Sequence, residues 1–435
     1  MFDNVFVTSN RSKYILINMK NAKSLILSKK SFKELTISIR NGNNIKNLSF
    51  KEELLSLLKD DEPVLRQVEP EQSYNPVLML SYDCNYDCLY CYQRDIKGIT
   101  TKIEIEDIPR IDSFYDKFCS HYNIEKKYGT IYLTGGEPLL PDNSDVIDAI
   151  LMFWKENRFI IKTNGSYIFE NRDKLLKINC EFHVSVDGVY ETHSKRRISK
   201  SKDNYKDTLL GIDWALSNDK KVVILSIFYP DNIDQYSHFF DLLEHLGWLK
   251  TDNLAVQFSL ELNNGCDDIC NEYYIEAIIA FDNLRKKDKR AYYISIPKFF
   301  PGSGFLIENL MHVKTGEYQP YRCNCLIIPS YSFAPDGKVY MCNLVADDCT
   351  YIGEYKEHIF INFNKIETIK KRNIDEMENC KHCDWKLACG GGCFITGVKG
   401  DGNLLNPSCG QWQNLKSNIH LQNIMNHILF DVFTE

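Results

Sequence analysis

The chain has 435 residues, of which 44% are hydrophobic and 26% are charged, and its formal net charge is −7. This apolar content supports buried cores and excludes a disordered chain, and the length is typical of two or three domains. The negative charge argues against a nucleic-acid-binding protein with a basic surface. Because the sequence shows neither a signal peptide nor a run of 18 apolar residues, we expect a soluble, cytoplasmic protein without a membrane segment.

The chain contains 16 cysteines. Disulfides are disfavoured in a reducing compartment, so clustered thiols there indicate metal ligands or catalytic groups. One group lies within residues 84–91 and a second, with ligand-like spacing, within residues 323–409. Cys119 and Cys180 stand among apolar neighbours, and we expect them in the core.

Residues 1–72 are predicted to form a small α+β module. Short apolar runs separated by turn residues indicate strands at 5–7, 14–17 and 24–27, and helical spacing indicates helices at 31–39 and 50–58. Such a module either binds a partner or is a packing extension of the main domain. Pro63 and Pro70 mark a linker to the next unit.

Residues 73–262 alternate between apolar strands and amphipathic helices. Strands are predicted at 77–81, 130–134, 158–163, 181–187, 221–229 and 254–260, with helices at 111–118, 146–154 and 204–216 among those between them. Repeated βα units imply a parallel sheet with right-handed crossovers. Six units are too few for a closed eight-stranded barrel. The predicted fold class is therefore α/β, with an open, partial (β/α)6 TIM barrel.

The first of these strands ends in a cysteine loop with C-x3-C-x2-C spacing, Cys84, Cys88 and Cys91. In parallel barrels the chemistry sits where strands end. Three thiolates can hold three irons of a 4Fe–4S cluster, which leaves one iron open to a small molecule. A zinc site and a set of buried thiols are the alternatives.

Three further motifs follow at successive strand ends. They are Gly135-Gly136-Glu137-Pro138, Thr163-Asn164-Gly165 and Ser185-Val186-Asp187-Gly188. Glycines allow the backbone to approach a ligand closely, Glu137 can accept a hydrogen bond from an amine, and a hydroxyl with a carboxylate suits a ribose diol. The recurrence of these motifs at strand ends predicts one shared site.

In combination, the four motifs resemble those of radical S-adenosylmethionine (SAM) enzymes over residues 75–262. The resemblance implies that the three cysteines ligate a 4Fe–4S cluster and that SAM chelates its fourth iron. It also implies a set of cofactor-binding residues: Tyr90, Gly135, Gly136, Glu137, Asn164, Ser185, Asp187 and Arg197. Arg197 would pair with the methionyl carboxylate; Arg196 is an alternative for this role, and Arg197 could instead be a solvated charge. No catalytic base or hydrogen donor is assigned.

The second cysteine group resembles the SPASM extension of radical SAM enzymes, which carries two auxiliary 4Fe–4S clusters. A hairpin signalled by Pro335-Asp336-Gly337 lies within it. The resemblance implies that Cys325, Cys342 and Cys393 ligate the first auxiliary cluster, either with Cys323 as its fourth ligand or with one iron left open, because the Cys323-x-Cys325 pair departs from the commoner arrangement. It also implies that Cys380, Cys383, Cys389 and Cys409 ligate the second. Spacing alone leaves zinc as the alternative. The predicted order of units is a bridging region at 263–318, the SPASM domain at 319–410 and a C-terminal helix at 411–435.

The resemblance implies a peptide maturase. A 5′-deoxyadenosyl radical would abstract hydrogen from a ribosomally synthesised precursor peptide and start a crosslink or a related modification. SAM, three 4Fe–4S clusters and a reducing protein such as ferredoxin or flavodoxin would be needed. The module at 1–72 would bind the leader sequence of the precursor.

Two other functions remain open. The first is an anaerobic sulfatase-maturating enzyme that forms formylglycine; Asn343 counts against it, because the resemblance places an aspartate base at that position and an amide cannot act as a base at neutral pH. The second is a non-enzymatic electron-transfer or structural protein, which the full set of SAM motifs disfavours.

Overall fold

A computed structural model of the chain describes most of its residues. The described ranges are 5–9, 13–40, 45–59, 66–67, 73–91, 100–200, 204–228, 235–260, 330–342, 348–383 and 385–392, with shorter pieces at 93, 232, 279–280, 283–284, 287–288, 290, 312–313, 315–318, 397–398, 403 and 405–408.

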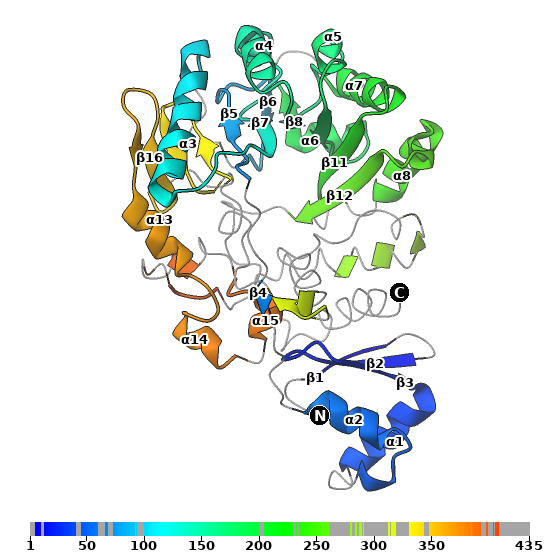
Figure 1. Ribbon diagram of the computed structural model, residues 1–435. Coiled ribbons are helices and arrows are strands. Elements are labelled where there is room, and N and C mark those ends of the chain that lie inside the picture. The colour runs from blue at the N-terminus through cyan, green and yellow to red at the C-terminus, as the bar shows by residue number, and fades with distance from the viewer. Residues whose placement is uncertain are drawn as a thin grey trace.

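The N-terminal module is a three-stranded antiparallel sheet covered by two helices, drawn in blue in Figure 1. Its elements are β1 (Val5–Ser9), β2 (Lys13–Asn18), β3 (Ser24–Ser28), α1 (Lys29–Arg40), the 3-10 turn η1 (Ile45–Asn47) and α2 (Lys51–Leu58). The strands and helices predicted from the sequence in this region are thereby confirmed. The sheet order is β1-β2-β3, so β1 and β3 are edge strands.

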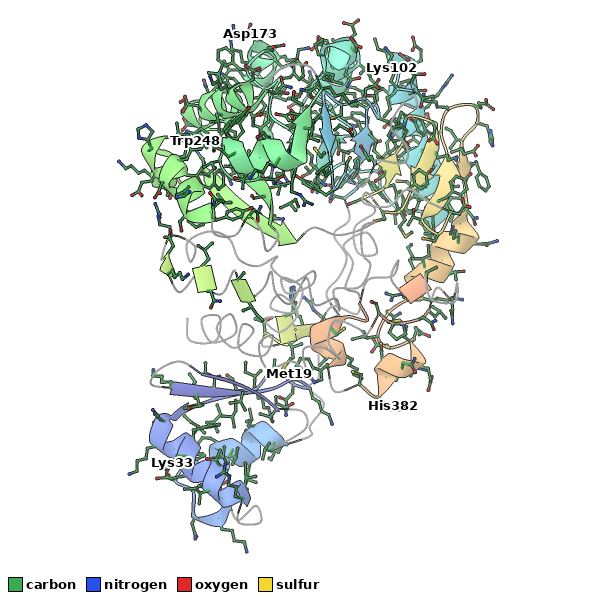
Figure 2. All side chains as sticks on the ribbon, turned by 180° about the vertical axis from the view of Figure 1, so that it is seen from behind. Met19, Lys33, Lys102, Asp173, Trp248 and His382 are labelled. Atoms are coloured by element: carbon green, nitrogen blue, oxygen red, sulfur yellow. The ribbon has the colours of Figure 1, made fainter. Side chains whose placement is uncertain are left out.

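The central strand β2 contributes to two cores, because successive side chains of a strand point to opposite faces. Leu16 packs with the helices of the module. Ile15, Ile17 and Met19 belong instead to the buried cluster of the main domain. Figure 2 shows Met19 on the side of the sheet that faces the rest of the chain and Lys33 on the helical side. The module is therefore packed against the main body through one face of its sheet.

The main body contains a six-stranded parallel sheet. Its strands are β5 (Val77–Met79), β7 (Thr130–Thr134), β8 (Arg158–Thr163), β9 (Cys180–Ser185), β11 (Lys221–Phe228) and β12 (Leu254–Leu260), and their spatial order follows the sequence. All neighbouring pairs are parallel. This arrangement confirms the predicted α/β fold with an open, partial barrel.

Helices cover the outer side of this sheet, as Figure 1 shows for α3, α4, α5, α7 and α8. The helical segments are η3 (Ile105–Asp107), α3 (Ile108–Tyr122), η4 (Pro141–Asn143), α4 (Ser144–Phe153), α5 (Arg172–Leu175), α6 (Tyr190–Arg196), α7 (Tyr205–Ser217), α8 (Tyr236–His245) and η6 (Trp248–Lys250). Local sequence sets their ends: α3 carries a proline in its first turn and stops at Asn123, whose φ of 51° is left-handed.

Alternate positions of β7 and β9 are fully buried, as expected from the two faces of a strand. Ile131, Leu133 and Phe182 have no exposed surface, whereas the neighbouring positions on these strands are mostly only partly buried. Cys119 and Cys180 are also buried, which confirms that they are core residues.

The C-terminal strands continue the same sheet, which the sequence analysis missed. β14 (Ser332–Phe333) pairs parallel with β5, and β15 (Lys338–Tyr340), β16 (Tyr351–Glu354) and β17 (Phe360–Ile361) follow as an antiparallel meander. The predicted hairpin joins β14 to β15, with Gly337 at φ +92°. An open barrel leaves the β5 edge exposed, and β14 covers it.

Two short ribbons and three helices complete the described structure. The ribbons pair β6 (Tyr86–Cys88) with β10 (Arg197–Ser199), and β4 (Arg66–Gln67) with β13 (Glu317–Tyr318). The helices are α13 (Phe363–Lys370), α14 (Glu378–Lys381) and α15 (Lys386–Cys389). The C-terminal helix predicted at 411–435 and most of the bridging region predicted at 263–318 lie outside the described residues. None of the helices described is long and apolar enough to cross a membrane.

Candidate active site at the strand ends

The cysteine loop that follows β5 is braced by strand pairing. β6 lies within the loop and pairs antiparallel with β10, which puts Cys88 opposite Arg197. The Cys91 N–H donates to the Cys88 carbonyl at 3.2 Å. Cys88 is buried, whereas Cys84 and Cys91 are partly exposed. The three thiols therefore lie on a single loop at the carboxyl end of the first barrel strand, and strand pairing with β10 holds this loop in place.

Two N–H donors approach the sulfur of Cys84. The Tyr86 N–H donates to Sγ at 3.4 Å, and Asn164 Nδ2 lies 3.9 Å from it. Burial raises the pKa of Cys84 to about 11, and the nearby Glu137 carboxylate adds to this shift. Because a thiol with this pKa is protonated at neutral pH, binding to a metal would release its proton.

The glycines of the second motif pack directly against the cysteine loop. The Gly136 N–H donates to Ser81 O and the Glu137 N–H to Asp83 O, both at 2.8 Å. A Cβ atom at Gly136 would lie 2.0 Å from Asp83 O, and one at Gly135, where φ is +131°, would lie 2.4 Å from Ser81 O. Only glycine allows this approach. The motif thus forms a backbone cradle beside the first cysteine.

The Glu137 carboxylate is fully buried and bonded within the protein. Oε1 accepts from Thr163 Oγ1 at 2.7 Å and from the Leu139 N–H at 3.0 Å, while Oε2 accepts from the Asn164 N–H at 2.7 Å. Burial raises its pKa, against the effect of these hydrogen bonds. The carboxylate joins the loop after β7 to the end of β8.

Asn164 joins the third motif to the cysteine loop. Its Nδ2 donates to Asn85 Oδ1 at 2.7 Å, Asn85 Nδ2 donates to Ser166 Oγ at 3.0 Å, and Ser166 Oγ donates back to Asn164 Oδ1 at 2.6 Å. This ring of hydrogen bonds fixes the residue after Cys84. Sequence reasoning found Asn164 but not Asn85 or Ser166, which belong to no motif.

Tyr90, Asp187 and Arg197 meet in one buried network. The Tyr90 hydroxyl donates to Asp187 Oδ2, and Arg197 Nη1 donates to Tyr90 Oη at 2.7 Å and lies 3.8 Å from Asp187 Oδ2. Asp187 Oδ1 accepts from the Ile227 N–H at 2.8 Å. Arg197 is only 9% exposed, so it is not a solvated charge. Arg196 lies over the Tyr90 ring, 5.6 Å from its centroid.

His193 is a buried neighbour that sequence reasoning missed. The Asp187 N–H donates to His193 Nδ1 at 3.4 Å, and the rings of Tyr86 and Tyr205 lie 5.9 and 4.9 Å away. Burial lowers its pKa well below the usual value, so the ring is neutral at pH 7. The sole sequence signal was its position shortly after Gly188.

The remaining predicted site residues fall into two groups. Ser185 ends β9 and is partly buried, and Cys342, Cys380, Cys383 and Cys389 also have described positions. Cys323, Cys325, Cys393, Cys409 and Asn343 lie outside the described residues.

Within the described part of the chain, no three His, Cys, Asp or Glu side chains converge on a single metal ion. In a 4Fe–4S cluster each thiolate binds its own iron, so the ligand sulfurs stand further apart than around one ion. Three thiols on one loop, a glycine cradle beside them and a buried cation fit such a cluster with a small zwitterionic ligand.

A cavity of about 340 Å³ is lined by Ser81, Asp83, Thr100, Lys102, Leu140, Asp142 and Asn143. None of the predicted cluster or cofactor residues lines it, but Ser81 and Asp83 accept hydrogen bonds from the glycine motif, so the cavity adjoins the site described above.

Comparison of the sequence with models of protein families identifies the domain that carries this site. Residues 78–243 match the model of the radical SAM superfamily. The chain therefore contains a radical SAM domain over these residues. Such a domain implies one 4Fe–4S cluster and SAM as cofactors, in agreement with the motifs on which the resemblance was based.

Similarity to curated proteins extends beyond the matched domain. A cysteine-type anaerobic sulfatase-maturating enzyme of Clostridium novyi is 24% identical over 72% of this chain and 85% of its own length. The radical SAM cyclopropyl synthase TigE of Paramaledivibacter caminithermalis is 22% identical over 86% of this chain and 77% of its own length.

Solved structures share the fold. The anSMEcpe enzyme with bound AdoMet superposes with a TM-score of 0.59 at 18% identity, covering 83% of this chain and 99% of its own. SuiB of Streptococcus suis bound to S-adenosylmethionine superposes with a TM-score of 0.52 at 14% identity, covering 94% of this chain and 98% of its own.

Replacing Cys88 by alanine is expected to remove the SAM cluster, because two remaining thiolates do not hold four irons. Iron and acid-labile sulfide should fall by about four atoms each per chain, and 5′-deoxyadenosine release with dithionite should stop. Cys119→Ala, which removes a buried thiol outside the motifs, is the control and should keep both. Cleavage of SAM by the Cys88 variant at the wild-type rate would refute the ligand assignment.

Replacing Gly136 by alanine is expected to push the glycine motif away from the cysteine loop, since the new Cβ would meet only backbone atoms there. Overpacking of this kind costs about 1–3 kcal/mol, so SAM affinity should fall about tenfold or more. Equilibrium dialysis with the reconstituted enzyme measures it. Gly247→Ala, with no atom near its Cβ, controls for general strain; equal losses in both variants would contradict the prediction.

Proposed function

We propose that the chain is a peptide maturase that uses SAM and a 4Fe–4S cluster on Cys84, Cys88 and Cys91 to modify a ribosomally synthesised precursor. The observation that carries the proposal is the folded N-terminal module together with the extent of the similarity. TigE and SuiB cover 86% and 94% of this chain, against 72% and 83% for the sulfatase-maturating enzymes. SuiB also has a structure with its precursor peptide SuiA, with a TM-score of 0.50.

The residues of the strand ends have separate tasks in this proposal. When bound, the cluster and SAM supply a 5′-deoxyadenosyl radical able to take hydrogen from an unactivated carbon. Arg197, a buried cation beside Cys88, would hold the methionyl carboxylate. The backbone of Gly135 and Gly136 would receive the methionyl amine and Ser185 the ribose, while the buried Asp187 carboxylate, bonded to Tyr90 and the Ile227 N–H, would hold Tyr90 and Arg197 in place beside it.

In this proposal Glu137 supports cofactor binding without touching the methionyl amine, although the sequence motif predicted a direct hydrogen bond. Three protein donors already occupy its carboxylate, which has no exposed surface. Its contribution to cofactor binding is therefore mainly to hold the glycine cradle and the end of β8 in place. Tyr90 and Asn164 act in the same way, through Arg197 and through the loop at Cys84.

The C-terminal cysteines supply two auxiliary clusters in this proposal. Cys380 and Cys383 lie on and just after α14, and the Cys383 N–H donates to Cys380 O at 3.0 Å. Cys389 is the last residue of α15. Cys342 lies just after β15, which is the second of the C-terminal strands that extend the barrel sheet. The clusters would take up the second electron of an oxidative modification.

A sulfatase-maturating activity is the second candidate, because an enzyme of that class is among the relatives and the anSMEcpe structure is similar in fold. Both activities begin with hydrogen abstraction from a peptide. They differ in the product: formylglycine arises from one Cys or Ser side chain, whereas a crosslink joins two residues.

The N-terminal module offers two edges for the leader sequence. The Asn18 N–H donates to Lys23 O at 2.9 Å, and hydrogen bonding alternates along antiparallel pairs. It follows that the N–H of Ile26 on β3 and that of Val7 on β1 point away from β2. An extended peptide can add as a strand at either edge.

Replacing Ile26 or Val7 by proline is expected to weaken precursor binding at the edge that is used, because proline removes the outward N–H. The matched controls are Ile26→Thr and Val7→Thr, which keep this group. Fluorescence anisotropy with a labelled precursor measures affinity, and uncoupled SAM cleavage should be unchanged. Wild-type affinity in both proline variants would rule out strand addition to this sheet.

The proposed function is tested by expressing the chain anaerobically with the small open reading frames that neighbour its gene and with a sulfatase peptide. Mass spectrometry is expected to show loss of hydrogen from a precursor, with fragmentation blocked between two linked residues. Formylglycine in the sulfatase peptide and an unmodified precursor would favour the second candidate.

A further inference from the structure

Arg372 is the largest fully buried side chain among the described residues, with 1% exposure. It follows α13 and precedes the cysteine-bearing helices α14 and α15 in the chain, both of which Figure 1 shows below the end of α13. A guanidinium stays charged inside a protein, and burying a charge is costly unless it is paired and hydrogen-bonded. A task at this position is therefore expected, although no motif in the sequence marks the residue.

The guanidinium clamps two separate backbone segments. Nη1 donates to Gly392 O at 2.9 Å, and Nη2 donates to Gly391 O at 3.2 Å and to Asn406 O at 2.7 Å. The fork of an arginine can reach two segments at once, which a lysine ammonium cannot do with the same geometry.

Both segments lead into predicted metal ligands. Gly391 and Gly392 lie between Cys389 and Cys393, and Ser408 directly precedes Cys409 in the sequence. The Ser408 N–H donates to Gly391 O at 3.1 Å. The two segments are thus held side by side, two residues after Cys389 and one residue before Cys409.

The packing between the two segments leaves no room for side chains. A Cβ at Gly392 would lie 2.3 Å from Ser408 O, and one at Gly397 would lie 2.2 Å from Asn406 O and 2.9 Å from Arg372 Nη2. Gly390, Gly391 and Gly392 all have positive φ, between 61° and 82°. These glycines let the backbone carbonyls turn toward the guanidinium.

We propose that Arg372 is the positioning residue and fixed counter-cation of a metal centre that includes Cys380, Cys383 and Cys389. This inference rests on the auxiliary clusters of the proposed function. Four thiolates around a 4Fe–4S core carry net negative charge, and cluster potentials depend on nearby charge and hydrogen bonds. A buried cation close to the ligand segments stabilises the reduced, more negative state and so raises the reduction potential.

The test uses a chain in which Cys84, Cys88 and Cys91 are all alanine, so that iron reports on the C-terminal centres alone. With Arg372 intact this chain is expected to bind about eight irons. Arg372→Met should lower the content by about four. In any cluster retained, the ratio of reduced to oxidised form at a fixed potential should fall about tenfold, a shift of about 59 mV for a one-electron couple. EPR-monitored titration measures it.

Two further variants separate the site from general folding. Arg372→Lys keeps the cation and is expected to restore part of the lost iron, with a potential nearer to that of intact Arg372. Arg290→Met removes another arginine with three carboxylate partners, Asp241, Glu244 and Asp288, on the barrel side. It is expected to keep the full iron content.

Two results would overturn the inference: unchanged iron and potential in Arg372→Met, or equal iron loss in Arg290→Met. Zinc in place of iron in the triple-alanine chain with Arg372 intact would instead refute the auxiliary clusters themselves. The failure of the proposed function and the failure of this inference are thereby distinguishable.

Discussion

The site depends on backbone contact between two loops at adjacent strand ends. The N–H groups of Gly136 and Glu137 bond to the carbonyls of Ser81 and Asp83, so the glycine motif and the cysteine loop behave as one unit. The buried Glu137 carboxylate extends the unit to β8, and leaving its donors without partners would cost about 1–3 kcal/mol each. The first cysteine is placed by this unit before any cofactor binds.

A second brace comes from outside the parallel sheet. The short ribbon of β6 and β10 sets Cys88 opposite Arg197, and the Arg197 guanidinium then reaches Tyr90. Sequence spacing identified Arg197 but left Arg196 as an alternative, because burial cannot be read from two adjacent arginines. In the structure Arg197 begins β10, is 9% exposed and bonds to Tyr90, whereas Arg196 ends α6 and is partly exposed.

The barrel was predictable because its strands contain apolar runs and because β5, β7, β8 and β9 are each followed by a motif. Strands such as β7 and β8 have the predicted bounds. The addition of β14 to the β5 edge was not predictable, because a two-residue strand has no periodicity and its partner lies some 250 residues away. For a similar reason the sequence identified only one residue of the hydrogen-bond ring. Asn164 was assigned to a motif, whereas Asn85 and Ser166 were not.

Arg372 could not be predicted from the sequence either, but here the sequence pattern was misleading, whereas for β14 there was no pattern to read. In the sequence it stands in the run Lys370-Lys371-Arg372, which is typical of a solvated helix end, yet its side chain is buried. The difference arises because α13 ends at Lys370 and the Arg372 side chain turns inward, toward the carbonyls of Gly391, Gly392 and Asn406. A charge can be buried here since the surrounding backbone is polar and fixed. The cysteine-bearing segment also contributes Ile374, Met377 and Trp385 to the main hydrophobic cluster, so the bonded cation adds a polar anchor beside a hydrophobic core.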